Sequence, residues 1–350
     1  MRSLTASFLT LLVLACSSST SEPGASAPDS AKPVVPDTNE GESEESKERS
    51  KDRDTTVTLG LATEDFWSVG MPLDHVQITA KVDGVVAADK KLEQAQGKAM
   101  MPFELPLAAP ANKLDANIEL SITAYMSPTS PMVVVQRLVT AKFVPRKAKL
   151  AYVLLELRCN TAPMAGGGIV TGPTCTDGTT CIGHKCVSPE MTELVDYYAD
   201  WAKKPPSRCG SAPDATLDVG EGLNEFASLT DGATVTLEAG PQCGHHIWIA
   251  TRMKNLQQSG TTTTISAVQP GSNLTVPPTA YPYAYAESAG TCELPGLRFQ
   301  VDLGAKVAEL LGKPLDITVE ATDTLGHKAT VTKKVNIAAT VKGGFPHCQN

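Results

Sequence analysis

The residues best suited to binding chemistry are two adjacent histidines close to a tryptophan. His245 and His246 lie in the run GPQCGHHIW, residues 240–248. Alternate residues of a strand share a face, so His246 would accompany Trp248 while His245 would face the other way. Adjacent histidines therefore cannot bind one metal ion without a bulge. Two interpretations stay open: a buried histidine beside a core tryptophan, or a metal or ligand site that uses His246 or His245.

A second group of candidate binding residues is formed by three tyrosines at every second position. Tyr281, Tyr283 and Tyr285 would line one side of an extended segment. Aromatic platforms that bind sugars or extended peptides are built in this way. Three prolines between residues 277 and 282 favour an edge or a loop, where the rings would be exposed. The alternative is that the rings pack at an interface or under a loop.

The chain has nine cysteines, and an odd number in an exported protein requires an explanation. If Cys16 is modified, eight cysteines remain for four disulfides: Cys159, Cys175, Cys181, Cys186, Cys209, Cys243, Cys292 and Cys348. We predict the pairs Cys243–Cys292 and Cys209–Cys348, because two of these residues lie inside the second β-rich region and two flank it. The other four cysteines are expected to pair locally.

Residues 1–15 have the pattern of an export signal. The only charge is Arg2, and the apolar stretch from Leu4 to Ala15 is shorter than the roughly 20 residues that a membrane-spanning helix needs. The run VLAC that ends at Cys16 resembles the lipobox of bacterial lipoproteins, in which cleavage precedes a cysteine that carries diacylglycerol. This resemblance implies a lipid anchor at Cys16 and attachment to the cell envelope, most simply the outer membrane, facing the periplasm or the surface. Plain secretion after an ordinary cleavage site is the alternative.

Residues 16–53 are expected to form a disordered tether. Residues 17–53 contain nine acidic and five basic residues and little that could form a core. Such a flexible chain reaches roughly 30–36 Å, enough to lift a folded body off a membrane surface. A recognition tail is the alternative. The formal net charge of −8 and the lack of a basic stripe argue against a nucleic-acid partner.

The rest of the sequence predicts an all-β fold. Apolar and polar residues alternate from Val76 to Val82 and from Ile118 to Tyr125, and many prolines leave no room for long helices. The same alternation returns in residues 245–251 and 315–321. We therefore expect two Ig-like antiparallel β-sandwich domains joined by a disulfide-rich segment and one short helix. The expected boundaries are 54–158 for the first domain, 159–213 for the joint, 214–342 for the second domain and 343–350 for a C-terminal tail.

The joint combines a small disulfide knot with the predicted helix. Cys175, Cys181 and Cys186 are closely spaced, and too few apolar residues surround them to form a core without crosslinks. Zinc binding with His184 as fourth ligand is the weaker alternative, so no metal and no cofactor are expected. The helix is expected at about 189–204, with Ser188 as its N-cap and an apolar stripe that ends at Trp201. This stripe would pack against a neighbouring domain or form a binding face.

Residues 240–248 carry a second resemblance. They are similar to a Gly-Pro-Gln-Gly-Gly-x-His-x-Trp signature of uncharacterised Gram-negative lipoproteins with Ig-like β domains, with Cys243 in place of a glycine. The segments Gly220–Gly222 and Phe226–Asp231 fit the same pattern. The likeness covers mainly Asp214–Ala338. It implies an Ig-like fold and an envelope location, and no activity.

The sequence contains no readable catalytic constellation. Gly-x-Ser-x-Gly, His-Glu-x-x-His and a glycine-rich phosphate loop are all missing, so we do not expect an enzyme. The expected function is that of a membrane-anchored exported lipoprotein that acts as a structural or ligand- or partner-binding module. The alternatives are a carbohydrate-binding or adhesive protein that uses Tyr281, Tyr283 and Tyr285, and a metal-binding protein that uses His246. A glycan or a protein is therefore the expected partner besides the membrane.

Overall fold

The computed structural model describes residues 55–66, 71–94, 100–126, 132–162, 172–210, 214–303 and 306–344. The expected signal peptide, Cys16, the tether and the end of the C-terminal tail with Cys348 lie outside these ranges. All described residues belong to one compact unit, residues 44–350. Strands dominate it, as the sequence predicts. None of the described helices has the length and apolar character needed to cross a membrane.

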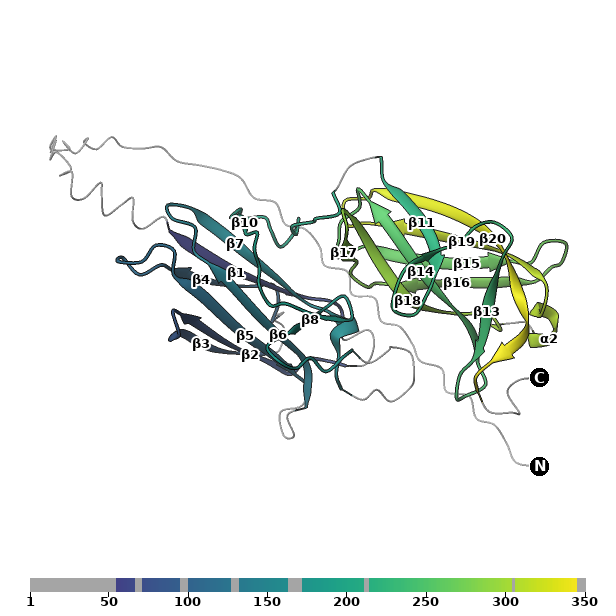
Figure 1. Ribbon diagram of the computed structural model, residues 1–350, viewed down its shortest axis with the longest axis horizontal. Coiled ribbons are helices and arrows are strands. Elements are labelled where there is room, and N and C mark those ends of the chain that lie inside the picture. Colours follow the sequence, from purple (N-terminus) through teal and green to yellow (C-terminus); the bar gives the residue numbers. More distant parts are fainter. Residues whose placement is uncertain are drawn as a thin grey trace, which may run out of the picture. The chain divides into compact units, whose positions relative to one another are not determined.

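The first β region consists of two four-stranded sheets (Figure 1). Their inward residues, such as Val57, Leu59 and Ile118, form one core. The alternation of apolar and polar residues that predicts these strands places every second side chain in that core. The first sheet runs β10 (Val195–Asp196), β7 (Ala148–Leu155), β1 (Thr56–Thr63), β4 (Phe103–Ala108), and the second β3 (Val85–Glu93), β2 (His75–Val82), β5 (Asn117–Tyr125), β6 (Val133–Lys142).

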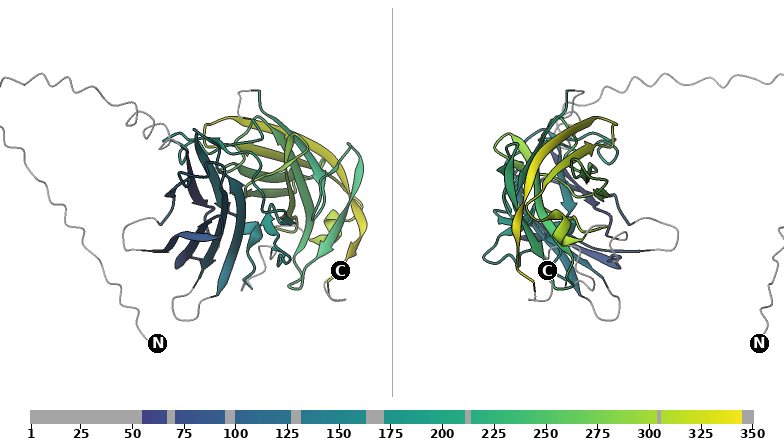
Figure 2. Two further views of the ribbon diagram at one scale, coloured as in Figure 1. Left: turned by 60° about the vertical axis from the view of Figure 1, so that its left-hand side comes forward. Right: turned by 90° about the vertical axis from the view of Figure 1, so that its right-hand side faces the viewer.

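The second β region is one continuous ten-stranded sheet around a second core (Figure 2). β14 pairs with three strands, β11, β13 and β18, and the long β20 pairs with both β13 and β19. A four-residue helix, α2 (Val307–Leu310), precedes β19. The strands are β11 (Thr216–Glu221), β12 (Ala227–Ser228), β13 (Ala233–Ala239), β14 (His245–Lys254), β15 (Thr262–Val268), β16 (Thr275–Tyr281), β17 (Ala286–Ser288), β18 (Thr291–Gln300), β19 (Pro314–Thr322) and β20 (Lys328–Lys342).

Each region contains one parallel strand pair, which differs from the expectation of wholly antiparallel sheets. β1 runs parallel to β7, in register from Thr56 beside Ala148 to Thr63 beside Leu155. β13 runs parallel to β20. A parallel pair needs a long connection. Here the intervening strands of each region supply it, so the pairing joins an early strand to a late one.

The helix expected at 189–204 does not form. The backbone of Thr140, in β6, bonds instead to Pro189 and Met191, with N–O distances of 2.9 and 2.8 Å. Farther along, β10 pairs with β7. β6 is an edge strand, and β7 would be one without β10, so the backbone groups along both strands need partners. Hydrogen bonding to these two edges prevails over the local helical pattern.

Trp201, the last residue of the apolar stripe, packs on the first β region although the stripe is not helical, whereas Val195 of the same stripe is exposed. The indole is fully buried, and its Nε1 donates a hydrogen bond to the carboxylate of Glu104. It covers Gly60, where an added Cβ would lie 2.8 Å from Leu150 and 3.1 Å from the indole ring. Glycine at this position therefore lets the tryptophan pack directly on β1.

The described residues contain three fully defined disulfides. Cys159–Cys181 and Cys175–Cys186 confirm local pairing of the four cysteines in the joint. The third, Cys209–Cys292, shows that the predicted pairs Cys243–Cys292 and Cys209–Cys348 are wrong.

Strand register explains the corrected pairing. Cys292 lies opposite Met253, near the end of β14, whereas Cys243 precedes the start of the same strand. About ten residues of strand separate the two ends, roughly 33 Å, and a disulfide allows only about 7 Å between Cα atoms. Cys209 lies at the correct end, because its carbonyl accepts a hydrogen bond from Asn255 N at 2.7 Å. Cys243 is also disulfide-bonded, and its partner is outside the described residues.

Replacing Trp201 by alanine should strongly destabilise the protein. The change removes a fully buried indole, so we expect a loss of about 3–5 kcal/mol in the free energy of unfolding. Urea denaturation followed by circular dichroism measures it. Val85→Ala, at an exposed position of β3, is the control and should change stability by less than about 0.5 kcal/mol. Equal effects of the two changes would contradict the packing role of Trp201.

Candidate functional site

A small disulfide-bonded hairpin covers the edge of β6. Its strands are β8 (Thr180–Ile182) and β9 (Lys185–Val187). Leu138 N donates to Thr180 Oγ1 at 3.0 Å, and Arg137 donates to the carbonyl of Cys181. The disulfide Cys159–Cys181 ties the hairpin to a short 3₁₀ turn, η1 (Leu157–Cys159), which follows β7. The disulfide-rich segment therefore packs on the first sandwich rather than standing apart as a joint.

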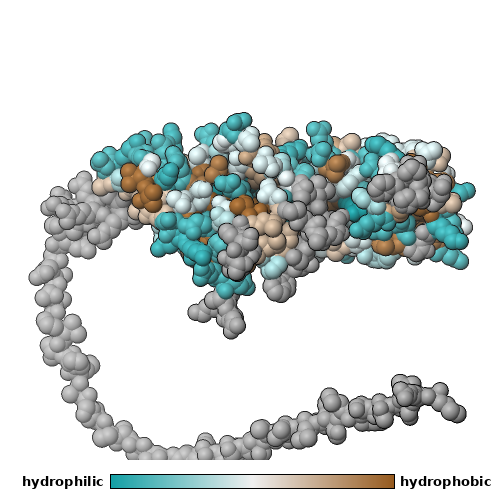
Figure 3. Space-filling view, turned by 90° about the horizontal axis from the view of Figure 1, so that it is seen from below, coloured by the Kyte–Doolittle hydropathy of each residue, from teal (hydrophilic) through white to brown (hydrophobic). Residues whose placement is uncertain are grey.

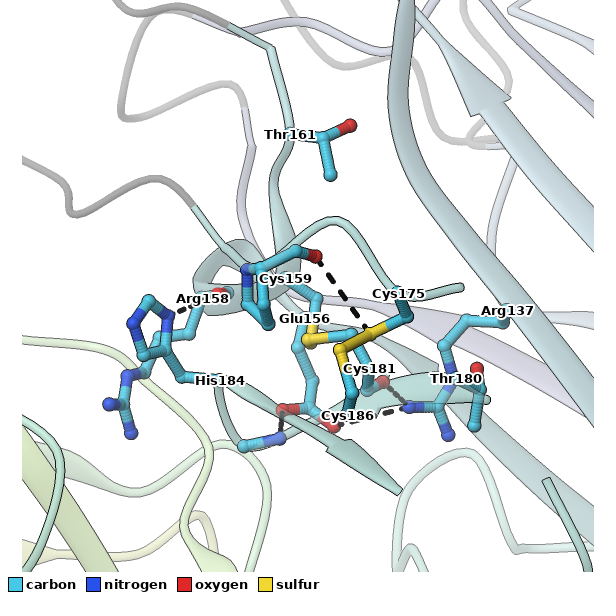
Figure 4. The surroundings of a disulfide bond; sticks show 12 residues. Arg137, Glu156, Arg158, Cys159, Thr161, Cys175, Thr180, Cys181, His184 and Cys186 are labelled. Carbon is cyan, nitrogen blue, oxygen red and sulfur yellow. Dashed lines mark hydrogen bonds and ion pairs between the residues drawn. A yellow bond between two sulfur atoms is a disulfide. The ribbon is translucent and has the colours of Figure 1, made fainter. Parts of the chain in front are cut away.

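Under the hairpin lies a buried ion pair. Arg137 Nη1 is 3.8 Å from Glu156 Oε1, and both side chains are buried (Figure 4). Glu156 Oε2 accepts a hydrogen bond from Gly183 N, in the turn of the hairpin, at 2.6 Å. Burial raises the pKa of Glu156, while Arg137 opposes this shift. The hairpin thus supplies a backbone donor to a largely buried carboxyl group.

A second buried carboxyl group, Glu64, lies close enough to Glu156 to interact with it. Its Oε2 accepts a hydrogen bond from Leu157 N at 2.5 Å, and its Oε1 accepts one from Ala284 N. Burial, and then repulsion from Glu156, raises the pKa of Glu64 to about 8, although the two N–H donors and Arg158 act in the opposite direction. Ala284 belongs to the segment after β16, so this carboxyl group bonds to both β regions.

Arg158 completes what we call the buried charge cluster: Glu64, Arg137, Glu156 and Arg158. Its carbonyl lies 3.0 Å from His184 Nδ1. Burial lowers the pKa of Arg158, and the two carboxylates raise it. Nη1 of Arg158 and Nε of Arg137 are buried without a hydrogen-bond partner. Buried donors left unpaired are costly. Hydrogen bonds satisfy the charged groups of the cluster only in part, and the surrounding packing holds them in place.

Two members of the cluster, Arg137 and Glu156, border a cavity of about 600 Å³. Its wall includes Glu156 and Arg137, the apolar side chains of Leu154 and Ile182, and residues 284–288 of the second β region. A volume of this size falls in the range of small-molecule sites, roughly 300–1,000 Å³. Apolar walls with a few polar groups are also typical of such sites.

The tyrosines do not form an exposed platform. Tyr285 is 1% exposed and Tyr281 is 7% exposed. The hydroxyl of Tyr285 lies 2.9 Å from Thr251 Oγ1 and 2.7 Å from Thr263 Oγ1, and that of Tyr281 donates to the carbonyl of Arg298. The expectation of exposed rings is therefore wrong. Tyr281, the last residue of β16, and Tyr285, which follows β16, belong to the second core instead.

Tyr283 supports the packing alternative. Its partly buried ring packs against the cores of both β regions. Burial raises its pKa, and Glu64 acts in the same direction. The segment with the three tyrosines therefore joins the second region to the first.

His245 and His246 have different surroundings, as strand alternation predicts. His245 Nδ1 lies 3.0 Å from Asp302. His246 packs edge-on against Trp248, with 4.8 Å between ring centroids, and Trp248 Nε1 donates to Glu238 Oε2 at 2.8 Å. His246 is buried, and this burial lowers its pKa to about 4, with Arg298 contributing in the same direction.

The histidines that the structure describes are not gathered into a metal site. Both ring nitrogens of His246 are buried without a hydrogen-bond partner. Within the described ranges, no group of three or more His, Cys, Asp or Glu side chains could hold a metal ion. His327 Nδ1 lies 3.1 Å from Asp323 Oδ2. His347 is outside the described residues.

The sequence did not identify the buried charge cluster. Glu64 and Glu156 each directly follow a strand, β1 and β7. In the parallel pair, Thr63 lies beside Leu155, so the next residue on each strand is one of the two glutamates. Their proximity is thus a consequence of parallel pairing, and knowledge of that pairing would have revealed it.

Comparison with known proteins adds little. No protein-family model and no curated protein matches the sequence. Among solved structures 28 chains match, one of them from work on the host cell surface retention of a bacterial ice-binding adhesin. That match has 9% sequence identity and a TM-score of 0.17, and it covers 81% of this chain and 64% of the adhesin chain. A TM-score this low supports no statement about function.

The raised pKa of Glu64 predicts a stability that falls with pH. The folded protein holds the proton more tightly than the unfolded chain, so raising the pH from about 4.5 to about 8 favours unfolding. The loss from pH 5 to pH 8 should be on the order of 3 kcal/mol from this group. Urea denaturation of the wild type and Glu64→Gln over this interval measures it, because the amide cannot ionise.

The control is Glu119→Gln, which neutralises an exposed carboxylate on β5. This variant should keep the pH dependence of the wild type, whereas Glu64→Gln should flatten it. An unchanged pH dependence in Glu64→Gln would contradict the assignment.

Proposed function

We propose that the protein is exported, anchored in the cell envelope by lipid at Cys16, and acts as a structural or partner-binding module. The observation that carries this proposal is the oxidation of every described cysteine: six form three defined disulfides, and Cys243 is also bonded. Disulfides persist outside the cytosol. An oxidising compartment agrees with the export signal expected at residues 1–15.

Cysteine parity supports lipidation. Six of the nine cysteines are paired with one another, which leaves Cys16, Cys243 and Cys348. Cys243 needs one partner from outside the described residues. If Cys348 is that partner, Cys16 is free for a thioether-linked lipid. The tether of residues 16–53 would then separate the folded body from the membrane, which we take to be the outer membrane.

The cavity is the proposed site of binding. It is the place where apolar side chains and buried charged groups meet in a space of ligand size. The tyrosine platform is not proposed, because two of its three rings are buried. On the face shown in Figure 3, hydrophobic residues occur in small groups between hydrophilic ones, which is ordinary for a protein surface. That surface therefore offers no stronger candidate than the cavity.

Replacing Cys16 tests the anchor. The full-length protein expressed in a Gram-negative host should partition with membranes, and its mature N-terminus should carry fatty-acid mass. Cys16→Ser should lose both properties, because the serine cannot form the thioether. Ser18→Ala is the control and should remain membrane-bound. An intact-mass spectrum of the wild type without acyl mass would overturn this part of the proposal.

Filling the cavity tests the binding site. The neutral dye Nile red should bind the protein saturably and become more fluorescent in apolar surroundings. Leu154→Trp places a larger side chain in the cavity wall and should weaken dye binding about tenfold or more, a change of 1.4 kcal/mol. Val85→Trp, at an exposed position away from the cavity wall, is the matched control. Equal dye binding by both variants would exclude the cavity.

A further inference from the structure

The turn of the β8–β9 hairpin fixes how its two cysteines face each other. Gly183 and His184 form a two-residue turn with φ angles of 57° and 70°, as a type I′ turn requires. Ile182 and Lys185 close this turn, so they form a hydrogen-bonded pair. The next pair, Cys181 opposite Cys186, is therefore a non-hydrogen-bonded pair.

Opposite residues of such a pair are unusually close. Their side chains point to the same face of the hairpin, and their Cα atoms are about 4.5 Å apart. Disulfides form at Cα separations of roughly 4.4–6.8 Å. In the native protein Cys181 bonds to Cys159 at a Cα distance of 5.7 Å, and Cys186 bonds to Cys175 at 5.5 Å. Each hairpin cysteine thus has an alternative partner directly across the hairpin.

The two disulfides differ in their access to solvent. Cys186 is exposed and Cys175 is half-buried, whereas Cys159 is 1% exposed and Cys181 is 4% exposed. Figure 4 shows the two sulfur–sulfur bonds in the same small region. A thiol in solution therefore reaches the outer disulfide, Cys175–Cys186, and not the inner one.

We propose that this hairpin is a thiol–disulfide exchange site. Reduction of the outer disulfide, Cys175–Cys186, leads to cleavage of the inner one, Cys159–Cys181, because Cys186 then attacks Cys181. A small dithiol supplies two electrons, breaks Cys175–Cys186 and is itself oxidised to a disulfide. The Cys186 thiolate then attacks Cys181 Sγ. The Cys181–Cys186 bond forms, the Cys159–Cys181 bond breaks, and Cys159 leaves as a thiolate that takes up a proton.

The exchange changes the covalent crosslinks of the hairpin. In the native protein two crosslinks join it to η1 and to the loop that holds Cys175. After exchange one crosslink joins β8 to β9, and Cys159 and Cys175 are free thiols. The hairpin turn also holds Glu156 through Gly183 N. The reagent class is a small dithiol. The four cysteines do not line the cavity, although Ile182 and Gly183 of the hairpin do.

Two variants of the outer disulfide test the exchange without a reductant. Cys175→Ser leaves Cys186 free opposite Cys181, whereas Cys186→Ser leaves Cys175 free with no cysteine across the hairpin. The full-length proteins are incubated at pH 8, quenched in acid, unfolded and labelled with N-ethylmaleimide. Cleavage at Asp177 and Lys185 then places Cys181 and Cys186 on separate peptides.

In Cys175→Ser we expect label on Cys159 and linked peptides that contain Cys181 and Cys186. In Cys186→Ser the label should remain on Cys175, with Cys159–Cys181 intact. A circular dichroism spectrum like that of the wild type shows that each variant keeps the fold, and intact Cys209–Cys292 shows that the exchange is confined to the hairpin. Label on Cys186 alone in the first variant, or equal label on Cys159 in both, would overturn the proposal.

The wild type provides an independent measurement. One equivalent of dithiothreitol should yield a Cys181–Cys186 crosslink, with label on Cys159 and Cys175. Label on Cys175 and Cys186, with Cys159–Cys181 retained throughout, would show that the outer disulfide opens without exchange and would overturn the proposal.

Discussion

The structure depends on the hydrogen bonding of two carboxyl groups that are removed from water. Glu64 and Glu156 are buried, and a buried carboxylate without donors would be severely destabilising. Backbone N–H groups meet this need, and they come from three separate parts of the chain: Leu157 after β7, Gly183 in the hairpin and Ala284 after β16. The carboxyl groups are satisfied only when all three parts are in place.

A second constraint, the open strand edges of the first β region, explains where the disulfide-rich segment packs. β6 ends one sheet, and β7 would end the other without the two-residue strand β10; unpaired edges are prone to pair with other chains. The hairpin covers part of β6, while residues 189–196 bond to both edges. The hairpin has too few apolar residues to form a core of its own, so its disulfides hold it in place. A segment that looks like a linker in the sequence is thus part of the first sandwich.

The sequence was sufficient to predict the structural features that depend on local patterns. Alternation located the strands, and the opposite surroundings of His245 and His246 followed from strand geometry alone. The spacing of Cys175, Cys181 and Cys186 indicated local disulfides, which the structure confirms. These features depend on residues that are close along the chain.

What the sequence did not reveal depends on contacts between distant residues. The apolar stripe that ends at Trp201 has helical spacing, but the edges of β6 and β7 determine its conformation. The pairing of Cys209 with Cys292 depends on which end of β14 each one approaches. The glutamates of the candidate site meet because β1 and β7 run parallel. Tyr281 and Tyr285 are buried because they pack in the second core, with their hydroxyl groups bonded to residues of β14, β15 and β18.

The most direct test of this account is native-state hydrogen exchange at the amide of Ala284. The account predicts that this amide exchanges only through a large opening, with a free energy close to that of the Leu157 amide, because both donate to Glu64. Exchange of Ala284 at the rate of an exposed loop, while Leu157 remains protected, would show that Glu64 does not join the two β regions.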